Sequence, residues 1–177
     1  MKRRTLFVLL AGSVLWTGGC DPYPGKLRES WEQSNKVFQV RIEIYDEGNK
    51  AHIFEPGCHI KLLSAPVGSS QWMQFGNAYF SRCDQNIRNR VRFINDETAY
   101  VFMQWWYSVT SDGGRTWSTW DVAAHLPGKA FYNPRLIEEV SISADGKGTM
   151  TLNPEGVAQK QRLTLYTTDF GRDWRTS

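Results

Sequence analysis

The main pattern after residue 36 is a short alternation of apolar and polar residues, which is typical of β-strands with one covered face. It is clearest at residues 38–44, where Phe, Val and Ile alternate with polar residues. The sequence Asp46-Glu47-Gly48-Asn49 that follows favours a turn, because Gly and Asn tolerate positive φ angles. We expect a second strand at 51–54, so that the two segments form a hairpin.

Short apolar or alternating segments continue to the end of the chain. They predict further strands at residues 59–63, 71–75, 78–82, 90–94, 99–109, 117–122, 137–143, 149–152 and 162–167. Between Ile142 and Met150, the residues ADGKG at 144–148 favour a tight reversal. No window beyond the first 20 residues keeps apolar residues at helical spacing for three turns. The pattern therefore predicts an all-β domain of roughly ten short strands.

The residues before this domain divide into two segments. Residues 21–36 begin with Pro22, Pro24 and Gly25 and then turn polar, which favours a tether with one short helical turn around 27–33. Residues 1–19 combine a basic start with an uncharged, mostly apolar run at 6–16. That run is too short for a membrane-spanning helix, which needs about 20 apolar residues. We interpret it as a secretory signal peptide, the alternative being a buried N-terminal helix or strand.

The end of this segment carries a recognisable motif. Thr17-Gly18-Gly19-Cys20 resembles the lipobox of bacterial lipoproteins. The resemblance implies cleavage before Cys20, lipid on its thiol and acylation of its amine, and two or three acyl chains give stable anchoring. Thr17 departs from the usual Leu, Val or Ile. Gly19 would also suit ordinary signal peptidase, which would leave a soluble protein. The predicted segments are a signal peptide at 1–19, a lipidated cysteine and tether at 20–36, and a β-rich domain at 37–177.

This assignment places the protein in the bacterial cell envelope, facing the periplasm. Asp21, directly after the cysteine, resembles the enterobacterial signal for retention in the inner membrane. If Cys20 carries lipid, Cys58 and Cys83 remain as a pair in an oxidising compartment. A disulfide between them would close a loop of about 26 residues and contribute roughly 3 kcal/mol. Two buried thiols or a metal site are the alternatives, although the chain has no CxxC or paired Cys/His spacing.

The charge of the chain argues against a nucleic-acid partner. The sequence has 21 Lys and Arg residues against 18 Asp and Glu, a formal charge of +3. Three of the cations, Lys2, Arg3 and Arg4, lie in the predicted signal peptide, which contains no acid. The mature chain would therefore be close to neutral and would lack the basic surface that binds the phosphates of a nucleic acid.

Two related segments give the most specific information on the fold. TSDGGRTW begins at Thr110 and TTDFGRDW begins at Thr167, and both fit Thr-x-Asp-x-Gly-x-x-Trp. They resemble the Asp-box, a hairpin of sialidases and other β-propellers. In such a hairpin the Asp accepts backbone N–H bonds, Gly supplies an unusual φ and Trp packs between strands. The candidate structural residues are Asp112, Gly114, Trp117, Asp169, Gly171 and Trp174.

The same motif limits the architecture. A propeller needs about four to eight four-stranded blades, which this chain cannot supply at the spacing of the two segments. We therefore expect a compact β-sandwich or a partial propeller-like stack of sheets that contains two Asp-box hairpins. The Asp-box is structural where it is known, so it indicates fold and not activity.

The sequence predicts neither catalysis nor a bound cofactor or metal. A serine hydrolase of the nucleophile-elbow type needs GxSxG, and the segment at Gly68 lacks the second glycine. The histidines His52, His59 and His125 are scattered and form no HExxH motif. A sialidase would need an arginine cluster and acids spread over a full propeller. We therefore expect a protein that is not an enzyme.

One aromatic run is a candidate binding surface. Trp105, Trp106 and Tyr107 are consecutive on a predicted strand, so at least one ring must point to the face opposite its neighbours. If that face is open, the rings are candidates for contact with a partner, since Trp and Tyr are enriched at binding hot spots. If both faces are covered, all three are core residues.

The combined features resemble the lipase-immunity lipoproteins of type VI secretion systems. The likeness lies in the lipobox and tether, a hairpin leading to Cys58, a second cysteine at Cys83, and a strand at 100–109 running into the motif that ends at Trp117. It implies a non-catalytic inhibitor, anchored by its lipid, that binds and neutralises a toxic effector. A glycan or cell-envelope binding module and a structural envelope lipoprotein are the alternative functions.

Overall fold

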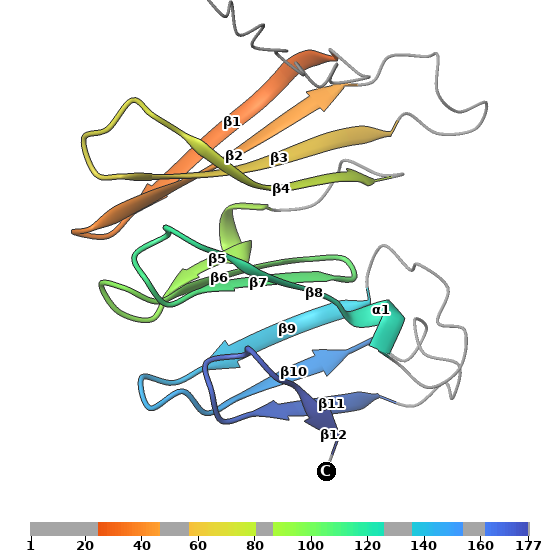
Figure 1. Ribbon diagram of the computed structural model, residues 1–177. Helices are drawn as coiled ribbons and strands as arrows, with labels where there is room; N and C mark the ends of the chain where they lie inside the picture. Colours follow the sequence, from red (N-terminus) through yellow and green to blue (C-terminus); the bar gives the residue numbers. More distant parts are fainter. Residues whose placement is uncertain (1–24, 47–56, 81–86, 126–135, 154–161, 177) are drawn as a thin grey trace, which may run out of the picture.

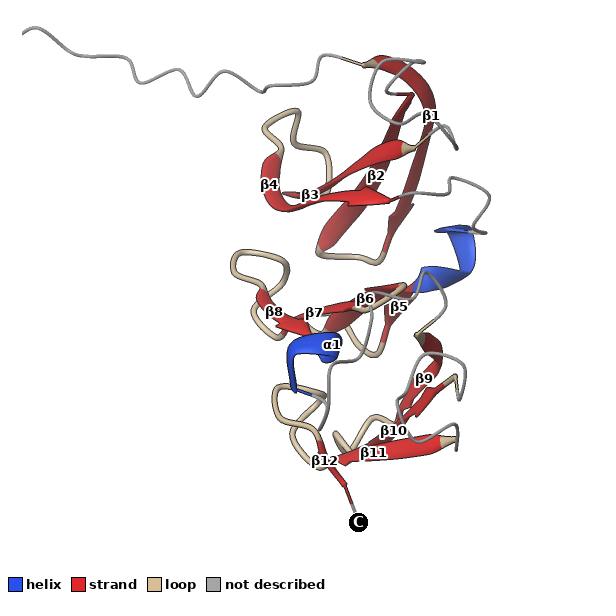
Figure 2. Ribbon diagram, turned by 90° about the vertical axis from the view of Figure 1, so that its right-hand side faces the viewer, coloured by secondary structure: helices blue, strands red, loops and turns tan. Residues whose placement is uncertain are grey.

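The computed structural model describes residues 25–46, 57–80, 87–125, 136–153 and 162–176. They form three four-stranded antiparallel sheets that lie one above another along the molecule (Figure 1). Within each sheet, strands that are consecutive in the chain lie next to each other, so every sheet is an up-and-down meander. The view turned by 90° shows the same order, with the first and third sheets at opposite ends of the stack (Figure 2).

The strands have the following bounds. The first sheet contains β1 (Lys26–Ser34), β2 (Phe38–Asp46), β3 (Cys58–Pro66) and β4 (Met73–Phe80). The second contains β5 (Val91–Phe93), β6 (Ala99–Met103), β7 (Trp106–Thr110) and β8 (Ser118–Asp121). The third contains β9 (Ile137–Ile142), β10 (Gly148–Leu152), β11 (Leu163–Thr167) and β12 (Arg175–Thr176). A 3-10 turn (Ile87–Arg90) precedes β5, and a one-turn helix, α1 (Val122–His125), follows β8.

Two hydrophobic cores hold the sheets together. The first core joins the alternating apolar residues of β2 and β3 to one face of the middle sheet; its members include Phe38, Val40, Ile42, Leu62, Val101, Met103 and Trp106. The second core joins the opposite face of the middle sheet to the third sheet; its members include Tyr100, Phe102, Tyr107, Val140, Met150, Leu165 and Trp174. Burial of apolar surface at these two interfaces is the main force that assembles the stack.

The middle sheet is covered on both faces. All five residues of β6 are buried. Val101 and Met103 belong to the first core, whereas Tyr100 and Phe102 belong to the second. Successive side chains of a strand point to opposite faces, so neighbours along β6 pack in different cores.

The outer faces of the first and third sheets carry many polar side chains, unlike the interfaces inside the stack. On β2 the residues between the buried ones are Gln39, Arg41 and Glu43, all half-buried. On the third sheet, Thr149 of β10 lies directly opposite Ser141 on one side and Tyr166 on the other. The stack thus has apolar interfaces inside and more polar faces at both ends, the pattern of antiparallel sheets with one face in water.

The all-β prediction is confirmed, and the arrangement is a stack of three sheets and not a two-sheet sandwich. The predicted strands near residues 38, 59, 90, 137, 149 and 162 correspond to β2, β3, β5, β9, β10 and β11. The predicted strands at 71–75 and 78–82 belong together in the region of β4, which runs from Met73 to Phe80. The expected strand at 51–54 lies outside the described residues.

Two expectations were wrong. The tether was expected to reach residue 36 with a helical turn at 27–33, but β1 already pairs with β2 from Lys26 onwards. Its inward residues are Glu29, Trp31 and Gln33, so only one of the three is apolar, and the strand depends on its pairing to β2. The predicted single strand at 99–109 is a hairpin of β6 and β7, joined by Gln104 and Trp105.

Candidate functional site

The first of the two turns with the Thr-x-Asp-x-Gly-x-x-Trp pattern, residues 110–117, joins β7 to β8 and is called the first box. The Thr110 hydroxyl donates to Asp112 Oδ1 at 2.9 Å and accepts the Gly114 N–H at 3.1 Å. The carboxylate of Asp112 then accepts the Thr116 N–H at 2.9 Å and the Thr116 hydroxyl at 2.6 Å. Gly113 and Gly114 have φ angles of 70° and 78°, which a side chain would oppose. The turn is closed by its own polar side chains.

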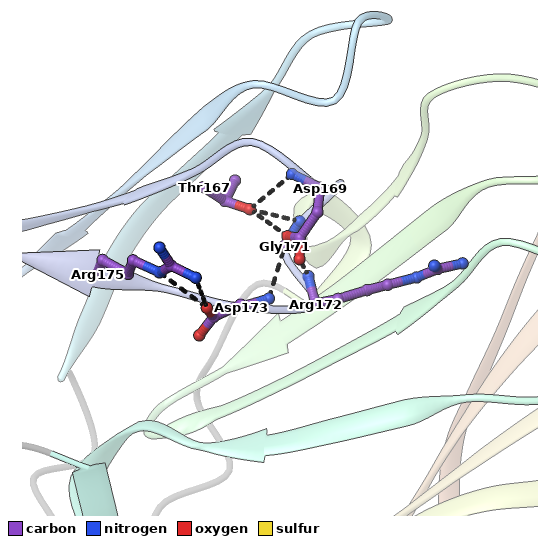
Figure 3. A network of polar contacts seen from close by, with 6 residues as sticks. All are labelled: Thr167, Asp169, Gly171, Arg172, Asp173 and Arg175. Carbon is purple, nitrogen blue, oxygen red and sulfur yellow. Dashed lines mark hydrogen bonds and ion pairs between the residues drawn. The ribbon is translucent and has the colours of Figure 1, made fainter.

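The second box, residues 167–174, joins β11 to β12 in the same way (Figure 3). The Thr167 hydroxyl donates to Asp169 Oδ1 at 2.7 Å and accepts the Gly171 N–H at 2.9 Å. Asp169 Oδ1 also accepts the N–H groups of Arg172 and Asp173, both at 3.1 Å. Asp173 stands where the first box has Thr116. Its backbone N–H bonds to the box carboxylate as that of Thr116 does, but its side chain does not; the Asp173 carboxylate pairs instead with Arg175 at 2.8 Å.

The carboxylates of both boxes are held in their charged form. Burial by itself would raise the pKa of Asp112, but bonds from the Thr116 side chain and backbone and from Thr110 together lower it. For Asp169 burial acts in the same direction, and the bonds from Thr167, Asp173 and Arg172 again lower the pKa. Each carboxylate therefore accepts three hydrogen bonds from its own turn, which suits a structural role.

The first box is attached to the first sheet. The Ser64 hydroxyl, on β3, donates to the Gly114 carbonyl at 2.8 Å and accepts the Trp117 Nε1–H at 3.1 Å. The Trp117 ring stacks on Phe75 of β4, with ring centroids 3.8 Å apart and an angle of 6° between the planes. A Cβ at Gly114 would lie 2.6 Å from the Phe38 ring. Glycine is therefore required here by contact as well as by φ.

The second box is attached to the middle sheet. The Tyr107 hydroxyl, on β7, donates to the Phe170 carbonyl at 3.1 Å. The Trp174 ring meets the Tyr107 ring edge to face, with centroids 5.4 Å apart. The indole Nε1 of Trp174 is buried and, among the residues that the structure describes, has no hydrogen-bond partner, unlike that of Trp117. The Arg172 side chain also donates to the Ser111 hydroxyl, which links the two boxes.

The turn chemistry expected from the sequence is therefore present, and it serves the fold. The candidate structural residues lie where each box closes and where each tryptophan packs on the preceding sheet. Through these contacts, the turn at the end of one sheet packs against the sheet before it in the chain. In each box the Asp carboxylate accepts three hydrogen bonds from the turn itself.

The aromatic run Trp105, Trp106 and Tyr107, expected as a candidate partner-binding surface, is mostly buried. Trp106 is 8% exposed and lies in the first core, and Tyr107 is fully buried in the second. Trp105 is half-buried in the hairpin turn and packs against both cores. Because the middle sheet is covered on both faces, these rings stabilise the stack. The expectation of an exposed aromatic surface at 105–107 was wrong for Trp106 and Tyr107.

A cluster of mostly half-buried side chains, which the sequence did not single out, lies on the outer face of the first sheet. The Arg41 guanidinium lies 3.9 Å from the centre of the Trp72 ring. The same guanidinium pairs with Glu32 of β1 at 2.7 Å and with Glu43 at 3.7 Å. The Tyr45 hydroxyl donates to Glu43 at 2.6 Å. We call Glu32, Arg41, Glu43, Tyr45 and Trp72 the Arg41–Trp72 surface.

This surface combines several features of a recognition site. Arg41, Glu43 and Tyr45 are alternate residues of β2 and so share one face. Leu63 of β3, directly opposite Arg41, and Leu27 of β1, directly opposite Tyr45, add apolar area, and Leu27 is 47% exposed. The alternation along β2 could have identified the β2 residues. Trp72 could not have been added without knowledge of how the strands pair.

Of the three cysteines that the sequence analysis singled out, one lies in the described part of the chain. Cys58 is fully buried in the first core at the start of β3, whereas Cys20 and Cys83 lie outside the described residues. In the described ranges, no three His, Cys, Asp or Glu side chains gather as a metal site would require. No helix in the part of the chain that the structure describes is long and apolar enough to span a membrane.

Comparisons of the chain with protein-family models, with curated proteins and with solved structures find no match.

Proposed function

We propose that this protein is a non-catalytic lipoprotein of the bacterial envelope that binds and neutralises a protein partner through the Arg41–Trp72 surface. The partner that we propose is a lipase effector delivered to the periplasm, so that the protein acts as an immunity protein. The observation that carries the proposal is the preorganised cluster of Arg41, Trp72 and Tyr45 on an outer sheet face. The anchor would be the lipid on Cys20.

The chemistry of this surface supports a protein partner. Trp, Tyr and Arg are the residue types most enriched at the hot spots of protein interfaces. Arg41 is held between an aromatic ring and two carboxylates, so it loses little side-chain freedom when a partner binds. The strands beneath it belong to one sheet, in which β1, β2 and β3 pair along almost their whole lengths. A surface held in place by paired strands suits an inhibitor, which binds its partner without turnover.

The charge of the surface also favours protein over nucleic acid. The positive Arg41 is balanced by Glu32 and Glu43. Lys61 of β3 lies with its ammonium 5.0 Å from the centre of the Tyr45 ring. Positive and negative groups are thus interspersed, and the continuous basic stripe of a phosphate-binding surface does not form here.

The test is a toxicity assay in which a lipase effector, sought first among the products of the neighbouring genes, is directed to the periplasm. We expect cells with the wild-type gene to survive and cells without it to die. Trp72→Ala and Arg41→Ala should abolish protection, because removing a hot-spot side chain weakens binding by about 30-fold or more. Thr151→Ala, on the outer face of the third sheet, is the control and should protect fully.

Two outcomes would count against the proposal. If cells without the gene survive as well as cells that carry it, the protein is not an immunity protein against that effector. If the gene protects but Trp72→Ala protects equally well, the Arg41–Trp72 surface is not the contact site. Binding of the purified proteins, measured by calorimetry, separates loss of affinity from loss of expression.

A further inference from the structure

A shallow groove lies on the outer face of the third sheet. The third sheet and the first sheet, which carries the Arg41–Trp72 surface, are at opposite ends of the stack (Figure 1). Its volume is about 460 Å³. The side chains that matter for its chemistry come from β9, β10, β11 and the turns beside them: Ser141, Ser143, Lys147, Thr149, Tyr166 and Thr168.

Strand register arranges these side chains in two rows. Ser141, Thr149 and Tyr166 are directly opposite one another on three adjacent strands, and so they form one row across the sheet. Side chains in such positions are about 5 Å apart and share one face. Ser143 and Thr168 each lie two residues further along the chain from a member of that row, and so they begin the second row.

The charged groups at the groove are already neutralised within it. The Lys147 ammonium pairs with Asp145 at 3.2 Å. The single hydrogen of the Ser143 hydroxyl is shared between two acceptors, the carboxylate of Asp145 at 2.5 Å and the Lys147 carbonyl at 2.8 Å. A carboxylate at this position opposes the entry of an anion, and no unpaired cation lines the groove in the described residues.

The remaining groups are neutral and available. Tyr166 is 46% exposed. The hydroxyls of Ser141, Thr149 and Thr168 form no hydrogen bond with any other residue in the described ranges. The groove therefore offers three unused hydroxyls, each able to donate and to accept, beside one exposed aromatic ring.

We infer that this groove binds a neutral carbohydrate. A sugar ring has an apolar face that stacks on an aromatic ring and a rim of hydroxyls that match donors and acceptors in either direction. A protein partner is less favoured here, because the face is rich in Ser and Thr and poor in the large apolar residues of interface cores. This site lies on a different sheet from the proposed partner surface, so it is a second binding activity, independent of the first.

The experiment titrates the full-length protein with cellohexaose and chitohexaose and measures binding by calorimetry. We expect binding of at least one of the two. Tyr166→Ala should weaken that binding by about tenfold or more, whereas Tyr166→Phe, which keeps the ring, should stay within about threefold of wild type. Thr149→Val should weaken binding, and Thr151→Val, on the same strand and face but outside the groove, is the matched control.

These variants change half-buried or exposed side chains, so near-UV circular dichroism should show that each remains folded. Absence of binding to both sugars at about 10 mM would overturn the inference. Binding that Tyr166→Ala leaves unchanged would also overturn it, since the sugar would then occupy another place. Loss of protection against the effector in the Trp72→Ala variant, with sugar binding retained, is the expected sign that the two activities are separate.

Discussion

The hydroxyl of Tyr107 donates a hydrogen bond of 3.1 Å to the carbonyl of Phe170, and so ties the third strand of the middle sheet to the turn that closes the third sheet. Ser64 makes the corresponding bond from the third strand of the first sheet to the Gly114 carbonyl. In both cases a side-chain hydroxyl reaches from one sheet into the box of the next. The boxes therefore order the stack as well as their own hairpins.

The first prediction concerns that bond. Tyr107→Phe keeps the ring in the second core but leaves the Phe170 carbonyl without its donor. We expect the free energy of unfolding to fall by about 1–2 kcal/mol, the cost of an unsatisfied polar group in a protected position. Urea denaturation measures it. Tyr166→Phe, which removes an exposed hydroxyl, should change stability by less than about 0.5 kcal/mol, and an equal loss in both variants would contradict the prediction.

The second prediction separates backbone strain from contact at glycine. Gly68 and Gly114 both have a φ angle of 78°, but a Cβ at Gly68 would meet nothing within 4 Å, whereas one at Gly114 would meet the Phe38 ring. Gly68→Ala should cost about 1–2 kcal/mol from φ alone. Gly114→Ala should cost about 1–3 kcal/mol more, because the core is overpacked. Equal losses in urea denaturation would show that the Phe38 contact is relieved without cost.

The third prediction concerns acid. The pKa values of Asp112 and Asp169 are lower in the folded protein than in the unfolded chain, where a carboxyl of this kind has a pKa of about 4. The stability that the two charged carboxylates add is therefore fully present above about pH 4, and it is lost as the pH falls through their lowered pKa values. The double variant Asp112→Asn, Asp169→Asn should be less stable than wild type at pH 7 by about 2 kcal/mol. Denaturation between pH 7 and pH 2 should show this difference shrinking below about pH 4; a difference independent of pH would contradict it.

The fourth prediction concerns the cysteines. We expect Cys58 and Cys83 to form a disulfide in protein isolated from the periplasm. Non-reducing mass mapping should recover the two peptides joined, and Cys83→Ser should lower the free energy of unfolding by roughly 3 kcal/mol if the bridge is unstrained. Alkylation of either thiol without prior reduction and denaturation would rule the bridge out.

Much of the fold could be predicted because its signals are local. The alternation along β2 and the paired motifs at Thr110 and Thr167 each act within a few residues, and the structure has the corresponding strand and turns. The hairpin turn at Gln104 was missed because it has no Gly, Asn or Pro, and Gln104 adopts a φ of 51°. A local motif thus predicts a local element well, while a turn imposed by packing leaves no such signal.

The candidate sites depend on which residues of neighbouring strands lie opposite each other, and this register is difficult to predict from the sequence. Arg41 and Trp72 meet only because β2, β3 and β4 pair as they do. The burial of Tyr107 had a local signal, since β6 is a continuous apolar run and not an alternating one, as expected of a strand with both faces covered. The interpretation of residues 105–107 as an exposed surface did not take account of the apolar run of β6, which pairs with β7.

The covered middle sheet has a consequence for how the molecule comes apart. Detaching either neighbouring sheet would expose half of the side chains of β6 and β7 to water, so neither end sheet can leave without weakening the strands that hold the other. We therefore expect a single cooperative melting transition for all three layers, with amide protons of β6 and β7 exchanging last.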